Sequence, residues 1–204
     1  MKLHERLIEG LQGGVDRHWR YTKDLLKIKP EYLLTVSVAD ALTDGFDNIH
    51  GLDLVIKLEE PTSNICWHLV HSAVGFKNWK KANRHSVNRK GKVDIFVEHQ
   101  KRSWIIELKG FNPSDAELRK DLIRIAQFLA ANNWTHHCDG GYLAFPTTTD
   151  EQARLKPLIE SSIDIENKRV GFSFHQSRVV TNEDPEDGIP VYYANCIELQ
   201  CLQP

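Results

Sequence analysis

Two carboxylates and a lysine with a spacing suited to hydrolytic chemistry lie in the stretch Lys92–Lys109, KVDIFVEHQKRSWIIELK. Apolar and polar residues alternate on both sides of a short polar run, which is typical of a β-hairpin. The register that pairs Glu98 with Ser103 across a two-residue turn also places Asp94 directly opposite Glu107. The sequence therefore predicts two acidic side chains at one point of a hairpin.

Facing carboxylates need a proton or a cation between them. Directly opposed residues have Cβ atoms about 4.5–5.5 Å apart, and like charges at that distance repel. Lys109 follows Glu107 by two residues, so it points to the same face of the strand. Acidic oxygens suit a hard divalent cation such as Mg²⁺ or Mn²⁺, and a nearby ammonium could act as acid, base or charge stabiliser. Asp94, Glu107 and Lys109 are the predicted catalytic set.

The triplet of an acidic residue, any residue and a lysine is uninformative alone. With 28 acidic residues and 15 lysines among 204, about two copies are expected by chance, and two occur, at Glu107–Lys109 and Glu166–Lys168. Only the first lies in a strong strand opposite an aspartate and ahead of a helix. The competing interpretation of this copy is an exposed strand face with a surface Lys–Glu contact.

The surrounding elements give the triplet an architectural context. A capping box, Ser114 with Glu117, begins the helix after the hairpin, and its apolar stripe starts at Leu118. Periodicity elsewhere predicts a helix before the hairpin, a strand between them and a short buried strand after the second helix. The predicted order is helix 30–45, strand 52–60, strands 92–98 and 103–109, helix 114–133 and strand 140–146.

This triplet in this order resembles the core of the PD-(D/E)xK nuclease superfamily. The resemblance covers Pro30 to Pro146, and Val93 stands where the proline of the motif would be. It implies a mixed α/β, restriction-endonuclease-like fold with an αβββαβ core, in which helices flank a mixed sheet. It also implies a Mg²⁺-dependent nuclease, or one using Mn²⁺, that hydrolyses phosphodiester bonds in DNA.

The resemblance also assigns roles to residues. Asp94, Glu107 and the backbone carbonyl of Leu108 would hold the metal, and Lys109 would orient or deprotonate water or stabilise charge. Glu31, in the helix before the first strand, would be a further ligand.

The helix after the hairpin would place further side chains near the active site. Lys120 and Gln127 are the second-shell candidates that the resemblance implies. The alternative for these two is a solvent-facing helix surface, and for Glu31 it is a helix-dipole contact.

A basic segment precedes Asp94. From Pro61 to Val93 there is no aspartate or glutamate, and basic residues crowd the second half of this window. Such a run would hold a nucleic-acid backbone, although a solvated loop is the alternative. The predicted nucleic-acid-binding residues are Lys77, Lys80, Lys81, Arg84, Arg89, Lys90 and Lys92.

Composition favours one globular domain over residues 1–204, with 41% apolar and 26% charged residues. We expect a helical arm over 1–29, made of two helices separated at Gly13-Gly14, a core over 30–146, and a helix and a β-hairpin over 147–204. No apolar run is long enough to span a membrane, and the charged start does not suit a signal peptide, so a cytoplasmic protein with reduced cysteines is expected.

Two other hypotheses about the function remain open. One is a catalytically inactive nuclease-fold protein that binds nucleic acid or another protein. The other is a zinc-bound structural protein using the run His136–Asp139 with Cys196 and Cys201, although no CxxC is present. Cleavage of both strands of a duplex would favour a homodimer.

Overall fold

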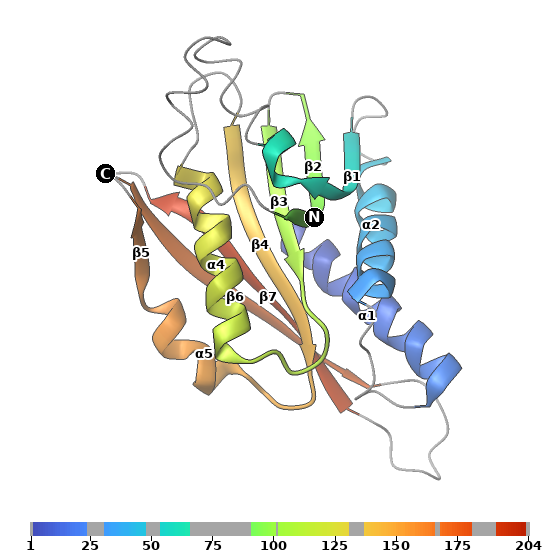
Figure 1. Ribbon diagram of the computed structural model, residues 1–204. Coiled ribbons are helices and arrows are strands. Elements are labelled where there is room, and N and C mark those ends of the chain that lie inside the picture. Colours follow the sequence, from blue (N-terminus) through green and yellow to red (C-terminus); the bar gives the residue numbers. More distant parts are fainter. Residues whose placement is uncertain are drawn as a thin grey trace.

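The computed structural model describes residues 2–23, 31–47, 54–65, 91–100, 102–130, 137–165, 168–180 and 191–202. These residues form a mixed α/β protein in which helices pack on both faces of one mixed sheet (Figure 1). In chain order the elements are α1 (Leu3–Thr22), α2 (Glu31–Asp47), β1 (Leu54–Pro61), β2 (Lys92–His99), β3 (Arg102–Leu108), α4 (Asp115–Ala130), β4 (His137–Thr147), α5 (Gln152–Ile159), β5 (Ser162–Ile165), β6 (Lys168–Val180) and β7 (Val191–Leu202).

The seven strands lie in the order β1-β2-β3-β4-β7-β6-β5. Only the β3–β4 pair is parallel, and α4 makes the crossover between these two strands. The predicted order of helix, three strands, helix and strand is confirmed by α2, β1, β2, β3, α4 and β4. The predicted C-terminal hairpin is confirmed too, because β6 and β7 pair antiparallel.

Each face of the sheet has its own apolar core. Alternation along β2 sends Phe96 to the face covered by α4 and α5, and Ile95 to the face covered by α1 and α2. The same division holds along β3, where Ile105 and Ile106 point to opposite cores. Burial on both faces explains why β3 carries two consecutive isoleucines, Ile105 and Ile106.

The predicted break in the N-terminal arm is wrong, because α1 runs through Gly13-Gly14 without interruption. Gly14 instead lies, together with Gly10, where α1 and α2 pack closely against each other. A Cβ at Gly10 would lie 2.5 Å from the Cα of Val38, and one at Gly14 would lie 3.0 Å from Leu34 Cδ2. Gly10 and Gly14 are one turn apart, so they let α2 approach the backbone of α1 closely.

Because α1 and α2 approach each other closely at Gly10, substitutions at Gly10 and Gly13 should change the free energy of unfolding in opposite directions. Gly10→Ala should destabilise the protein by about 1–3 kcal/mol, because the new methyl group meets backbone that cannot move aside alone. Gly13→Ala, which meets nothing within 4 Å, should stabilise it by about 0.5–1 kcal/mol. Urea unfolding of both variants checks this. Equal effects at the two positions would show that α1 and α2 do not pack through Gly10.

The region after β4 also differs from expectation. A helix is predicted from Thr149 to Lys168, but α5 ends at Ile159 and the short edge strand β5 follows it. The apolar residues Ile163 and Ile165 are compatible with either a helix or a strand. The segment forms a strand because it pairs with β6. Within the described ranges, no helix is both long enough and apolar enough to cross a bilayer.

Candidate active site

The hairpin of β2 and β3 has the register that the sequence predicts. His99 pairs with Arg102 and Ile95 with Ile106, so the next positions along this ladder are Asp94 and Glu107. The turn is tight, with a positive φ of 57° at Gln100. The backbone N–H of Leu108 donates a hydrogen bond of 2.7 Å to Asp94 Oδ2, which fixes the Asp94 carboxyl across the end of the hairpin.

The two carboxyls are buried together. The side chain of Glu107 is 1% exposed, and burial together with the charge of Asp94 raises its pKa to about 9. Burial also raises the pKa of Asp94, although the hydrogen bond from Leu108 opposes that shift. In the metal-free protein the pair therefore retains a proton near neutral pH, as expected of carboxylates that face each other without a cation.

One oxygen of Glu107 has a cation beside it but no hydrogen bond. Arg124 Nη2 lies 2.6 Å from Glu107 Oε1, and this contact is an ion pair rather than a hydrogen bond. The proximity of Arg124 lowers the pKa of Glu107, but burial and Asp94 act more strongly in the other direction. In the structure, Arg124 is therefore the cation that faces this buried oxygen.

Lys109 lies just beyond the end of β3, where its own N–H donates to the carbonyl of Ala144 at 3.0 Å. Its Nζ lies 2.9 Å from Asp121 Oδ2 and 3.9 Å from Glu31 Oε1. Burial alone would lower the pKa of Lys109, but the hydrogen bond to Asp121 and the nearby carboxylates raise it. Lys109 is therefore a fixed ammonium, which suits charge stabilisation better than proton abstraction.

Helix α4 supplies two residues that sequence reasoning missed. Asp121, 3% exposed, holds Lys109, and its other oxygen lies 3.3 Å from Arg124 Nη2. Of the two residues predicted on this helix, Lys120 is exposed and Gln127 is half-buried, and both stay predictions. One signal was available in the sequence, because Asp121 falls within the buried stripe of α4 and a charge in that stripe needs a partner.

The first turn of α2 brings Glu31 to the same place. Its contact with Lys109 at 3.9 Å joins the helix before β1 to the hairpin. Glu31 remains about half exposed, and no third carboxylate in the described parts of the chain comes close enough to share one ion with both Asp94 and Glu107. Glu31 and the carbonyl of Leu108 stay predictions as metal ligands.

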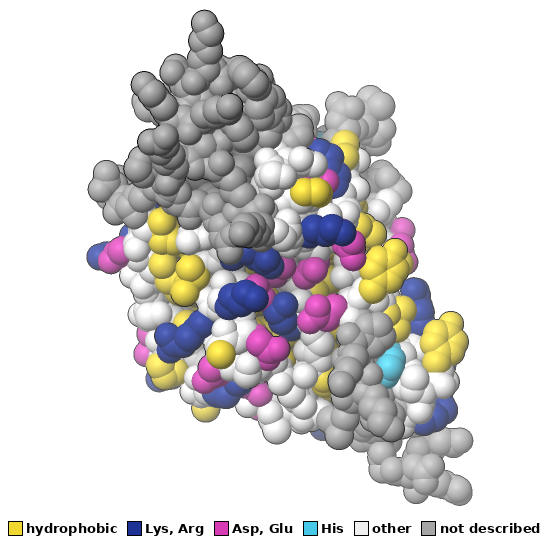
Figure 2. All heavy atoms as spheres, in the orientation of Figure 1, with side chains coloured by type: hydrophobic (Ala, Val, Ile, Leu, Met, Phe, Trp, Pro, Cys, Tyr) yellow, Lys and Arg dark blue, Asp and Glu magenta, His cyan; other side chains and the backbone are white. Residues whose placement is uncertain are grey.

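The basic segment is described only at its end. Lys77, Lys80, Lys81, Arg84, Arg89 and Lys90 lie outside the described residues. Lys92 is exposed and lies 2.7 Å from Glu59. Next to it, a Cβ at Gly91 would lie 3.7 Å from Arg124 Nη1, so the segment returns to the sheet beside the carboxylate cluster. Figure 2 shows acidic and basic side chains gathered on this face, between α4 and α2 of Figure 1.

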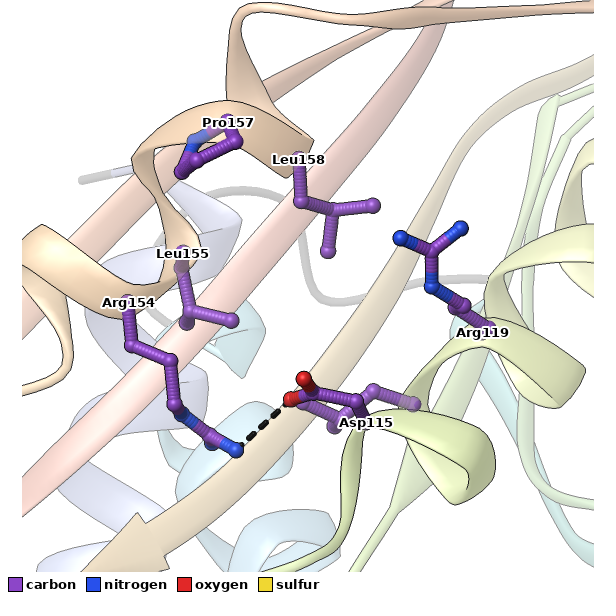
Figure 3. Close-up of a pocket in the computed structure, with 7 residues that line it drawn as sticks. Asp115, Arg119, Arg154, Leu155, Pro157 and Leu158 are labelled. Atoms are coloured by element: carbon purple, nitrogen blue, oxygen red, sulfur yellow. Dashed lines mark hydrogen bonds and ion pairs between the residues drawn. The ribbon is translucent and has the colours of Figure 1, made fainter.

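A separate pocket of about 220 Å³ lies between α4 and α5 (Figure 3). Arg154 of α5 reaches Asp115 of α4 at 2.7 Å across it, and Leu155 and Leu158 form its apolar side. The pocket contains none of the site residues predicted from the sequence.

The cluster suits a hard divalent cation better than a soft one. Its donors are carboxylate oxygens, its paired acids favour protonation when no cation is present, and Glu107 Oε1 lacks a hydrogen bond. The residues therefore fit Mg²⁺ or Mn²⁺.

No family model, curated protein or solved structure matches this chain.

Proposed function

We propose that the protein is a metal-dependent nuclease of the PD-(D/E)xK type that hydrolyses phosphodiester bonds in DNA. The observation that carries this proposal is the meeting of Asp94, Glu107, Lys109 and Glu31 at one end of the β2–β3 hairpin. The element order around them, from α2 to β4, gives further support.

The metal would be held by Asp94 and Glu107, with the Leu108 carbonyl as a further ligand, and Glu31 would contact Lys109 rather than the ion. When bound, a divalent ion polarises the phosphate and lowers the pKa of the attacking water. Asp94 is already oriented by the N–H of Leu108, so the ligand on β2 is in place before any cation arrives. Glu107 must release its proton to bind, which links metal affinity to pH.

Lys109 would stabilise the negative charge that develops on the phosphoryl oxygens. The Lys109 side chain is only 18% exposed, so its charge interacts more strongly there than it would in water. Asp121 orients this ammonium from α4, and Arg124 stabilises Asp121 in turn. The protein would thus provide a metal site on one side of the phosphate and a fixed cation on the other.

The DNA backbone would be held by the basic segment. Its residues Lys77 to Lys90, with Lys92, supply the positive charge that phosphate contacts require. The end of this segment at Gly91 lies beside Arg124, which would bring a bound strand to the carboxylates.

One contact favours a second candidate function, a nuclease-fold module without catalysis. The guanidinium of Arg124 lies 2.6 Å from Glu107 Oε1, within the space that a cation ligand to this oxygen would need. A protein that uses an arginine there permanently would bind nucleic acid or a protein partner without cutting.

Cleavage assays separate the two candidates. We expect plasmid and single-stranded DNA to be cut in Mg²⁺ or Mn²⁺ and left intact in chelator, and Mg²⁺ to raise the melting temperature. Cutting that persists in chelator would contradict the metal role. DNA binding without cutting, and without a metal-dependent melting shift, would leave the non-catalytic module.

A further inference from the structure

We propose a second metal site, formed by His4, His175 and Glu198, that binds a divalent transition metal such as Zn²⁺. It is independent of the nuclease proposal. The three residues come from the first turn of α1, from β6 and from β7, and they lie on the sheet face that α1 covers. An ion there would tie the beginning of α1 to the C-terminal strands.

The distances suit a metal ion. Nδ1 of His4 lies 3.4 Å, and Nε2 of His175 lies 3.2 Å, from the same oxygen, Oε2 of Glu198. Zinc binds nitrogen and oxygen at about 2.0–2.2 Å, so donor atoms of a tetrahedral site lie roughly 3.3 Å apart. All three donor atoms lie within 4.8 Å of one another.

The other oxygen of Glu198 is held by neighbours. The hydroxyl of Tyr142 and the side-chain amide of Gln200 donate to Oε1 at 3.1 and 2.6 Å. These bonds turn Oε2 towards the two imidazoles. Hydrogen-bonding partners of this kind orient the ligands of metal sites and increase their affinity.

The donors also favour a transition metal over Mg²⁺. Two imidazoles and one carboxylate form a donor set used for zinc and other first-row metals, and three protein ligands leave a fourth position open. The side chains of His4 and Glu198 are only 12% and 13% exposed, so the site is sheltered.

One change must accompany binding. The rings of His4 and His175 are stacked, with centroids 3.6 Å apart and planes within 4° of parallel. A metal lies near the plane of each imidazole that binds it, so the two rings must turn out of this stack. His4 belongs to α1 and not to the sheet, so its ring is the one that we expect to turn.

Zinc titration of the metal-free full-length chain by calorimetry tests the proposal. Asp94→Asn serves as the starting protein, so that the carboxylate cluster does not take up zinc. We expect one equivalent to bind, and His4→Ala or His175→Ala to weaken the affinity by at least about 100-fold. Tyr142→Phe should weaken it about 10-fold, since it removes only a supporting bond. His99→Ala, a histidine of the β2–β3 hairpin, should leave it unchanged.

Cobalt provides a second measurement. Co²⁺ bound to this site should give the visible absorption of a four- or five-coordinate ion, lost in His4→Ala and in His175→Gln. Binding of zinc that survives both histidine substitutions, in variants whose circular dichroism is native, would overturn the proposal. So would the absence of any zinc binding by the starting protein. Neither result bears on cleavage in Mg²⁺.

Discussion

Replacing Lys109 by methionine is expected to lower the rate of metal-dependent DNA cleavage by about 10²–10³-fold. Methionine keeps an unbranched, flexible side chain but removes the ammonium that Asp121 holds at 2.9 Å. Binding of Mg²⁺ should persist, because Asp94 and Glu107 are unchanged. Initial rates on plasmid DNA, with Mg²⁺ affinity measured by thermal shift, check both expectations.

A matched lysine controls for loss of positive charge. Lys156→Met removes an ammonium from α5, where the side chain is 70% exposed and only 3.7 Å from Glu160, and should leave the rate unchanged. The fold should tolerate Lys109→Met, because Asp121 keeps Arg124 as a partner at 3.3 Å. Cleavage at the wild-type rate by Lys109→Met would remove Lys109 from the mechanism.

Glu107→Gln should change how stability depends on pH. The pKa of Glu107 is raised from 4.5 to about 9 in the folded protein, so the folded state binds this proton more tightly than the unfolded state does. Stability from this group is therefore fully present below pH 4.5 and is lost as the pH rises through about 9. The slope between these values is at most about 1.4 kcal/mol per pH unit, and glutamine should remove it.

Urea unfolding at a series of pH values between 5 and 9, without metal, measures this difference. Glu160→Gln, at an exposed position on α5, should keep the wild-type slope. Mg²⁺ should flatten the wild-type curve, because a bound cation stabilises the ionised pair of Asp94 and Glu107. Identical curves for Glu107→Gln and wild type would show that Glu107 is ionised at neutral pH.

Local signals in the sequence predicted the hairpin and its neighbours well. The register of β2 against β3, which ends at Ile95 and Ile106 just before Asp94 and Glu107, follows from alternation and a two-residue turn, both of which depend only on nearby residues. The capping box at Ser114 forms as expected, with hydrogen bonds between its hydroxyl, its N–H and Glu117. Both features are decided within a few residues of chain.

Contacts between helices and strands that are distant in the chain could not be predicted from local patterns. Asp121 and Arg124 reach the site only because of how α4 packs on the sheet against β4, and helical spacing offers several polar positions that could do so. A Gly-Gly pair such as Gly13-Gly14 can end a helix or lie within one. Here the helix continues through the pair because α1 packs against α2 at Gly14. No local pattern indicates that His4 meets His175 and Glu198, which lie more than a hundred residues away in the chain.

The place of β7 in the sheet has a consequence for how the protein is made. β7 lies between β4 and β6, yet it follows both of them in the chain. While the ribosome extends the chain through Val180, β4 therefore has an unpaired edge, and the β5–β6 ribbon has no partner. The two parts become one sheet only when Val191–Leu202 leaves the exit tunnel. Until then the nascent chain exposes strand edges of the kind that chaperones shield from aggregation.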